Sequence, residues 1–71
     1  MSMERKMEIL RFLRRVRRYE QSGIDVHMVI ENGYVLYYIV VGGVRRYFDG
    51  VYTMAEYHTY QDAILGMKGG N

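Results

Sequence analysis

The chain has 71 residues, no cysteine, two histidines and a formal net charge of +2. This length fits one domain, and so short a chain buries only about 60% of the surface that it exposes when unfolded, so we expect modest stability. The absence of cysteine excludes a disulfide framework and a thiolate nucleophile, and two histidines are too few for a zinc site of the usual kind. No apolar run approaches the roughly 18 residues of a membrane span, which predicts a cytoplasmic protein without a membrane partner.

Small domains without disulfides or metals often gain the burial they lack by forming oligomers. Hydrophobic residues make up 49% of this chain and include eight tyrosines. We therefore expect a homodimer.

Positive charge is concentrated near the start of the sequence. Seven of the ten lysine and arginine residues lie between Arg5 and Arg18, and arginine outnumbers lysine eight to two. The planar guanidinium of arginine suits phosphate and carboxylate partners better than the lysine amine does. Genomic composition or a hot habitat can produce the same bias.

Residues 3–20 have the pattern of an amphipathic helix. Ile9, Phe12, Leu13 and Val16 recur at helical spacing and should face the interior. The same spacing places four arginines on the outer side, a set called here the arginine stripe: Arg11, Arg14, Arg15 and Arg18. Ser2 is a suitable N-cap, and Ser22 with Gly23 should end the helix.

Two strands joined by a tight turn should follow, over residues 24–31 and 34–41. Asn32 and Gly33 tolerate the positive φ of a type I′ turn, and a two-residue loop pairs Glu31 with Tyr34, which fixes both faces of the sheet. The face expected to form the core carries Ile24, Val26, Met28, Ile30, Val35, Tyr37, Ile39 and Val41. The other face carries Asp25, His27, Val29, Glu31, Tyr34, Leu36, Tyr38 and Val40, and it is apolar enough that we expect something to cover part of it.

A third strand and a second helix complete the pattern. Gly42-Gly43 predicts a second tight turn into a strand over residues 44–48, which Asp49-Gly50 ends. Arg46 would fall on the core face, so either it lies at an open edge or a bulge realigns the strand. A capping box starts a helix over residues 54–66, and residues 67–71 should form a frayed tail. The capping residues are Thr53 and Glu56, and the side chains expected toward the sheet are Met54, Tyr57, Tyr60, Ile64 and Leu65.

The sequence thus predicts an α+β domain of order α-β-β-β-α, a three-stranded antiparallel meander packed with two helices. This order resembles that of double-stranded RNA-binding domains over nearly the whole chain. Those domains carry a lysine-rich cluster where the second helix begins, whereas this chain has Thr53-Met54-Ala55-Glu56-Tyr57, so that phosphate contact is not expected here. The segment 37–53 also resembles the strand, hairpin and helix start of integrase arm-type DNA-binding domains, which contact DNA with the sheet.

The arginine stripe has two interpretations. It can bind backbone phosphates, which predicts a salt-dependent affinity, and Arg45 and Arg46 could extend it. Alternatively it is a solvated face, because arginines in the last turns favour the negative end of the helix dipole and Glu8 can pair with Arg11.

The second sheet face offers tyrosines beside an arginine: Tyr34, Tyr38, Arg45 and Tyr47. Such a surface can stack exposed bases or form a protein interface, including one between two copies of the chain. A third alternative is that the first helix covers it over Val29, Leu36 and Val40.

Catalytic and metal-binding patterns are absent from the sequence. Some toxin ribonucleases share the α-β-β-β-α order and use a strand histidine, which would correspond to His27, but their glycine-serine-histidine pattern is missing. The acidic residues are dispersed, so no metal and no cofactor is predicted. The hypothesis is a non-enzymatic nucleic-acid-binding module. The alternative is a protein-binding regulator of the small phage- or virus-encoded type, acting through the tyrosine and arginine surface, and a small ribonuclease is a distant third.

Overall fold

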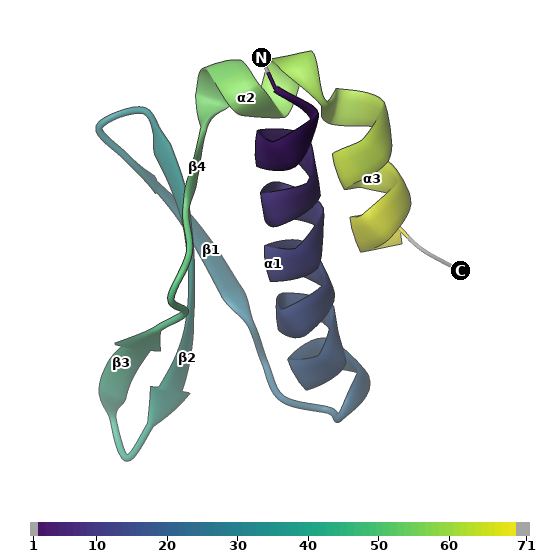
Figure 1. Ribbon diagram of the computed structural model, residues 1–71. Helices are drawn as coiled ribbons and strands as arrows, with labels where there is room; N and C mark the ends of the chain where they lie inside the picture. The colour runs from purple at the N-terminus through teal and green to yellow at the C-terminus, as the bar shows by residue number, and fades with distance from the viewer. Residues whose placement is uncertain (1, 70–71) are drawn as a thin grey trace.

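The structure is a computed structural model that describes residues 2–69, with side chains described for residues 2–67. It confirms the predicted mixed α+β class, and all helices lie on one side of the sheet (Figure 1). In chain order the elements are α1 (Met3–Gln21), β1 (His27–Glu31), β2 (Tyr34–Val41), β3 (Val44–Tyr47), β4 (Tyr52–Thr53), α2 (Met54–Thr59) and α3 (Gln61–Gly69).

The sheet is built around β2, which pairs with β1 along one side and with β3 and β4 along the other. The predicted register is confirmed, from Glu31 opposite Tyr34 to His27 opposite Tyr38. Asn32 and Gly33 adopt φ values of 52° and 80°, as a type I′ turn requires. The β4 strand was not predicted; its two residues pair with the start of β2.

The second hairpin is regular, with Val41 opposite Val44 and Ile39 opposite Arg46. No bulge is needed, because Arg46 lies exposed on an outer strand of the sheet, the first of the two arrangements expected from the sequence. The third strand ends at Tyr47 rather than at residue 48. The Phe48 side chain turns toward α1 and packs edge-on against Tyr19, with ring centroids 4.9 Å apart.

The helix α1 forms as predicted and extends one residue further, to Gln21. The Ser2 hydroxyl accepts a hydrogen bond from the Arg5 amide at 3.0 Å, which confirms the cap. The core joins the apolar side of α1 to the sheet and to α3: Ile9, Phe12, Leu13, Val16, Val35, Tyr37, Tyr52 and Ile64 are all buried.

The first strand begins at His27, so the prediction of a start at Ile24 was wrong. The amide of Ile24 donates to the Tyr19 carbonyl at 3.1 Å and so helps to close the end of α1. Residues 24–26 lead from the helix to the sheet and make no strand pairing.

The single helix predicted over residues 54–66 is two helices. At Tyr60 the backbone leaves helical geometry, with φ −112° and ψ 25°, and α3 turns back along α1 (Figure 1). The bend buries Ile64 and leaves Leu65 exposed, against expectation. Residues 67–69 are helical rather than frayed, whereas residues 70–71 lie outside the described residues.

The face of the sheet that packs on α1, called the inner face, is only partly covered. Val35 and Tyr37 are buried, whereas three other residues expected in the core are exposed because α1 lies over the centre of the sheet: Met28, Ile30 and Val41. Ile24, also expected in the core, is exposed in the segment between α1 and β1. The opposite, outer face meets no helix of the described chain, so the alternative in which the first helix covers it was wrong.

Candidate nucleic-acid interface

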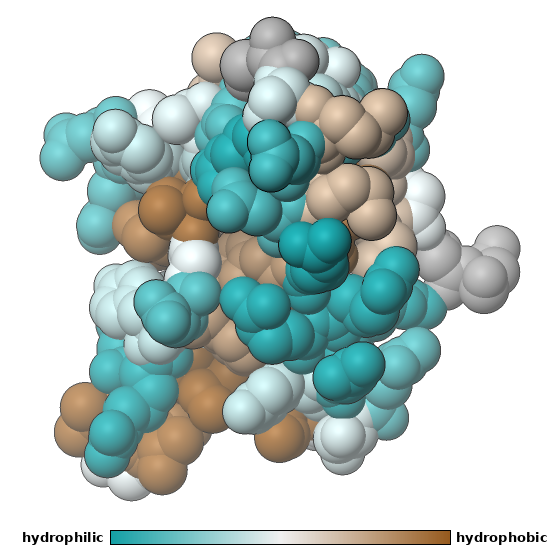
Figure 2. Space-filling model, viewed as in Figure 1, coloured by the Kyte–Doolittle hydropathy of each residue, from teal (hydrophilic) through white to brown (hydrophobic). Residues whose placement is uncertain are grey.

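The arginine stripe lies on the exposed side of α1. All four of its residues are exposed, and the helix residues between them that face the sheet are buried. Figure 2 shows hydrophilic side chains along this side of the molecule and hydrophobic ones over the β2–β3 hairpin. The helical spacing in the sequence therefore placed these arginines correctly.

No stripe arginine forms an ion pair with a carboxylate among the described residues. Both ion pairs found there belong to Arg5, which contacts Glu8 at 3.4 Å and Glu56 at 2.6 Å. Glu8 thus pairs with Arg5 rather than with Arg11, the partner that the solvated-face interpretation offered. Arg15 donates a long hydrogen bond of 3.5 Å to the Asp49 carbonyl and lies 5.6 Å from the centroid of the Phe12 ring.

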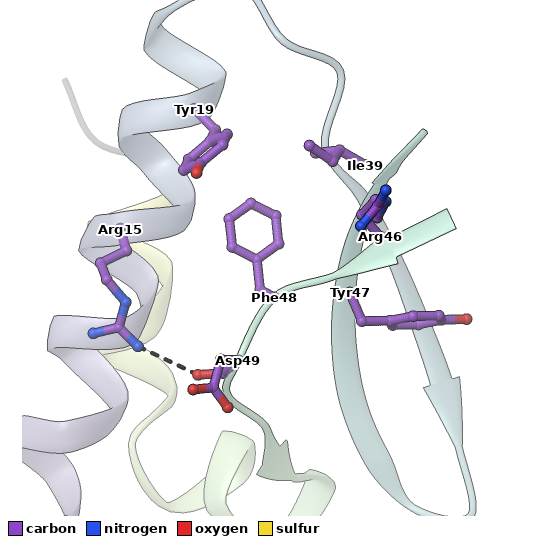
Figure 3. A pocket seen from close by; sticks show the side chains of 7 residues that line it. All are labelled: Arg15, Tyr19, Ile39, Arg46, Tyr47, Phe48 and Asp49. Atoms are coloured by element: carbon purple, nitrogen blue, oxygen red, sulfur yellow. Dashed lines mark hydrogen bonds between the residues drawn. The ribbon is translucent and has the colours of Figure 1, made fainter. Parts of the chain in front are cut away.

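A hollow of about 310 Å³ between α1 and β3 extends this basic surface (Figure 3). Arg15 lines it from α1 and Arg46 from β3, with the paired rings of Tyr19 and Phe48 between them. The exposed Asp49 carboxylate lies at its rim beside Arg15. Two arginines from different elements therefore line one hollow.

A second hollow of about 300 Å³ adjoins the first and shares Arg15 and Asp49 with it. Arg11 and Arg5 also line it, facing the loop that connects β3 to β4. The two hollows form a trough along one side of α1, edged by Arg11, Arg15 and Arg46.

Arg45 does not belong to this surface, although it precedes Arg46 in the chain. It lies opposite Val40 on the outer sheet face, whereas Arg46 lies opposite Ile39 on the inner face. Of the two arginines predicted to extend the stripe, only Arg46 therefore lies where it can do so.

The outer sheet face gathers a row of rings around Tyr38. His27 stacks on Tyr38 at 5.0 Å between centroids, and Tyr47 lies 5.3 Å from it. The Arg45 guanidinium lies 4.4 Å above the Tyr38 ring and donates to the Tyr47 hydroxyl at 3.3 Å. This hydrogen bond is the main reason that the pKa of Arg45 is raised.

Tyr34 stands apart from this row. It is exposed and pairs with Glu31 and Thr53 at the opposite end of β2 from Tyr38. The predicted group of four thus separates into a cluster of Tyr38, Arg45 and Tyr47, which His27 joins, and one isolated tyrosine.

Sequence reasoning missed the role of Arg5. Its guanidinium binds both carboxylate oxygens of Glu56, at 2.6 and 3.0 Å, and donates to the Val51 carbonyl at 2.9 Å. Chiefly through these hydrogen bonds, Arg5 lowers the pKa of Glu56 from 4.5 to about 2, while Glu56 raises that of Arg5. The capping box predicted from the sequence does place Glu56 at the end of a helix. It does not identify Arg5 as the partner of Glu56, because Arg5 lies far away in sequence.

Other groups that could carry chemistry are sparse among the described residues. His27 has an aromatic neighbour but no carboxylate or nucleophile in contact among the described residues. In the same part of the chain, no three histidine, aspartate or glutamate side chains gather as a metal site would require. Among its helices, none has the length and apolar character that crossing a bilayer demands. Comparisons with protein-family models, curated proteins and solved structures find no match.

Proposed function

We propose that this chain is a small non-enzymatic module that binds the phosphate backbone of nucleic acid through the outer side of α1. The observation that carries the proposal is the set of four exposed arginines that form no ion pair among the described residues. Like charges held on one helix face repel one another, and an anionic partner relieves that repulsion.

Arg46 and the trough support the same proposal. Arg15 and Arg46 line the hollow from opposite walls, so phosphate groups of one nucleic-acid backbone can contact both arginines. Arg14 and Arg18 lie further round the helix and can reach neighbouring phosphates. Contacts of this kind position a protein on nucleic acid without reading its sequence.

Salt dependence tests the proposal. Four phosphate contacts on duplex DNA give a slope of about −3.5 in a plot of log K against log salt concentration. Fluorescence anisotropy with mixed-sequence DNA and RNA duplexes measures that slope, and the double variant Arg14→Glu, Arg18→Glu should abolish binding. Absence of binding at low salt in the micromolar range would end the proposal.

The second candidate is a protein-binding regulator that uses the outer sheet face. The observation that favours it is the uncovered cluster of Tyr38, Arg45 and Tyr47, since tyrosine and arginine are the residues enriched at binding hot spots. A partner protein captured on this face should stay bound after nuclease treatment and should be lost with Tyr34→Ala, Tyr38→Ala. Loss of capture on nuclease treatment would reject this candidate.

A further inference from the structure

The strand β1 forms one edge of the sheet. Among the described residues it pairs with β2 and with no other strand. Because Glu31 and Tyr34 flank a two-residue turn, every second residue from Glu31 directs its backbone groups toward β2. Ile30 therefore directs its N–H and C=O toward the open edge, where an added strand can bind them.

Apolar side chains accompany this edge. Met28 and Ile30 are each 49% exposed on the inner face, although their cross-strand neighbours Tyr37 and Val35 are buried. Together with Tyr52, Met54 and Tyr57 they line an apolar hollow of about 220 Å³ beside the edge. Long exposed edges of this kind invite pairing with another strand.

The sequence of β1 is complementary to itself. If two copies pair antiparallel about Val29, His27 of each lies opposite Glu31 of the other, and Met28 lies opposite Ile30. An imidazole thus lies opposite a carboxylate that can accept a hydrogen bond from it on the outer face, and apolar side chains lie opposite each other on the inner face. The same register puts Ile30 in a hydrogen-bonded pair, as its outward backbone groups require.

The β3 strand, at the opposite edge of the sheet, is not complementary to itself. Antiparallel pairing of two β3 strands about Arg45, or about Arg46, would set that arginine directly against the same arginine of the second copy. Like charges directly opposite one another destabilise a strand pair. Of the two outer strands compared, β1 is the one suited to a second copy.

We propose that two copies of the chain form a two-fold dimer by antiparallel pairing of their β1 strands about Val29, which joins the two sheets into one. Since every helix lies on the inner face, both arginine stripes then lie on the same side of the dimer. The dimer does not rest on nucleic-acid binding, but it would let one duplex contact both stripes and so increase the avidity.

Analytical ultracentrifugation across the micromolar to millimolar range tests the dimer. Ile30→Lys places a charge on the edge and should raise the dimer dissociation constant about tenfold or more. Val44→Lys on β3 and Val40→Lys on the outer face serve as matched controls, because both valines are also about half exposed and should leave the constant unchanged. Far-UV circular dichroism confirms that each variant is folded.

The register is tested by exchanging charges. His27→Glu alone should weaken the dimer about tenfold, because two like-charged pairs form in each dimer. Adding Glu31→Lys should restore the affinity, since the glutamate at position 27 of each copy then faces the lysine at position 31 of the other. A monomeric wild-type protein throughout the range, dissociation by Val40→Lys or Val44→Lys in place of Ile30→Lys, or a double variant no tighter than His27→Glu would each overturn the proposal.

Discussion

At the residue scale, the core contains one polar contact between aromatic side chains. The hydroxyl oxygens of Tyr37 and Tyr52 lie 2.5 Å apart, and both residues are buried. Burial is the main cause of the raised pKa of each phenol. The pair links β2 to β4 and holds the short fourth strand against the sheet.

We predict that Tyr37→Phe lowers the free energy of unfolding by about 1–3 kcal/mol, the usual effect of a buried hydroxyl left without its partner. The Tyr52 hydroxyl has no other hydrogen-bond partner among the described residues. Urea unfolding of the single and double phenylalanine variants measures the coupling. Strictly additive losses in the double variant would contradict the prediction.

The structural role of Gly50 cannot be predicted from the sequence. Its position after Asp49 indicates a strand end, but its φ lies outside the left-handed region, and a Cβ there would overlap the buried Phe12 ring. Glycine is needed here because of Phe12 in α1, which is distant in sequence. No local sequence pattern therefore predicts this need.

Gly50→Ala should therefore lower the free energy of unfolding by roughly 1–3 kcal/mol, as overpacking of a core does. Gly66→Ala is the matched control, because nothing lies within 4 Å of its Cβ position and alanine favours a helix. Thermal unfolding should show Gly66→Ala at or above the wild-type stability. Equal stabilities for the two variants would refute the assigned role of Gly50.

At the scale of elements, the contact between Arg5 and Glu56 fastens α1 to α2. Glu56 also accepts from the Thr53 amide at 2.9 Å, so one carboxylate serves the helix cap and the ion pair together. Its side chain is only 12% exposed, which limits solvent screening. The position of α2, and hence of the bend into α3, depends on this contact.

This carboxylate predicts acid sensitivity. Because the pKa of Glu56 is lowered from 4.5 to about 2 in the folded protein, the unfolded chain takes up its proton first as pH falls. The stabilisation is complete above pH 4.5 and is lost as pH falls toward 2. The urea concentration at the midpoint of unfolding should decrease as pH falls across this range. In the Glu56→Gln variant this decrease should be smaller.

Glu8→Gln is the control for that measurement. Glu8 also pairs with Arg5, but its side chain is 63% exposed and the distance is 3.4 Å. The control should keep the pH dependence of the wild type. A Glu56→Gln protein with the full wild-type pH dependence would contradict the assigned role of this carboxylate.

The elements also show which features the sequence can predict. Local signals were sufficient for the Ser2 cap, the Thr53 capping box and the Asn32-Gly33 turn. The late start of β1 and the bend at Tyr60 were not predicted, because both depend on how α1 and its neighbours pack. Strand and helix limits of this kind are set by tertiary contacts.

At the scale of the whole molecule, the arginine stripe and the cluster around Tyr38 lie on different sides. The stripe on α1 faces away from the sheet, and the outer sheet face with Tyr38 faces away from the helices. Helical spacing alone predicted the stripe. The sequence also placed Arg46 on the core face and Arg45 on the other face, as the structure confirms. The absence of a helix over the outer face depends on the order of the layers, which the sequence left open.

Two variants of equal charge test the central claim, that nucleic acid binds the outer side of α1. Arg14→Glu and Arg45→Glu each lower the net charge by two, and both residues are exposed, but they lie on opposite sides of the molecule. With a mixed-sequence duplex at low salt, Arg14→Glu should weaken binding about tenfold or more while Arg45→Glu changes it little. Equal losses, or a larger loss with Arg45→Glu, would contradict the account.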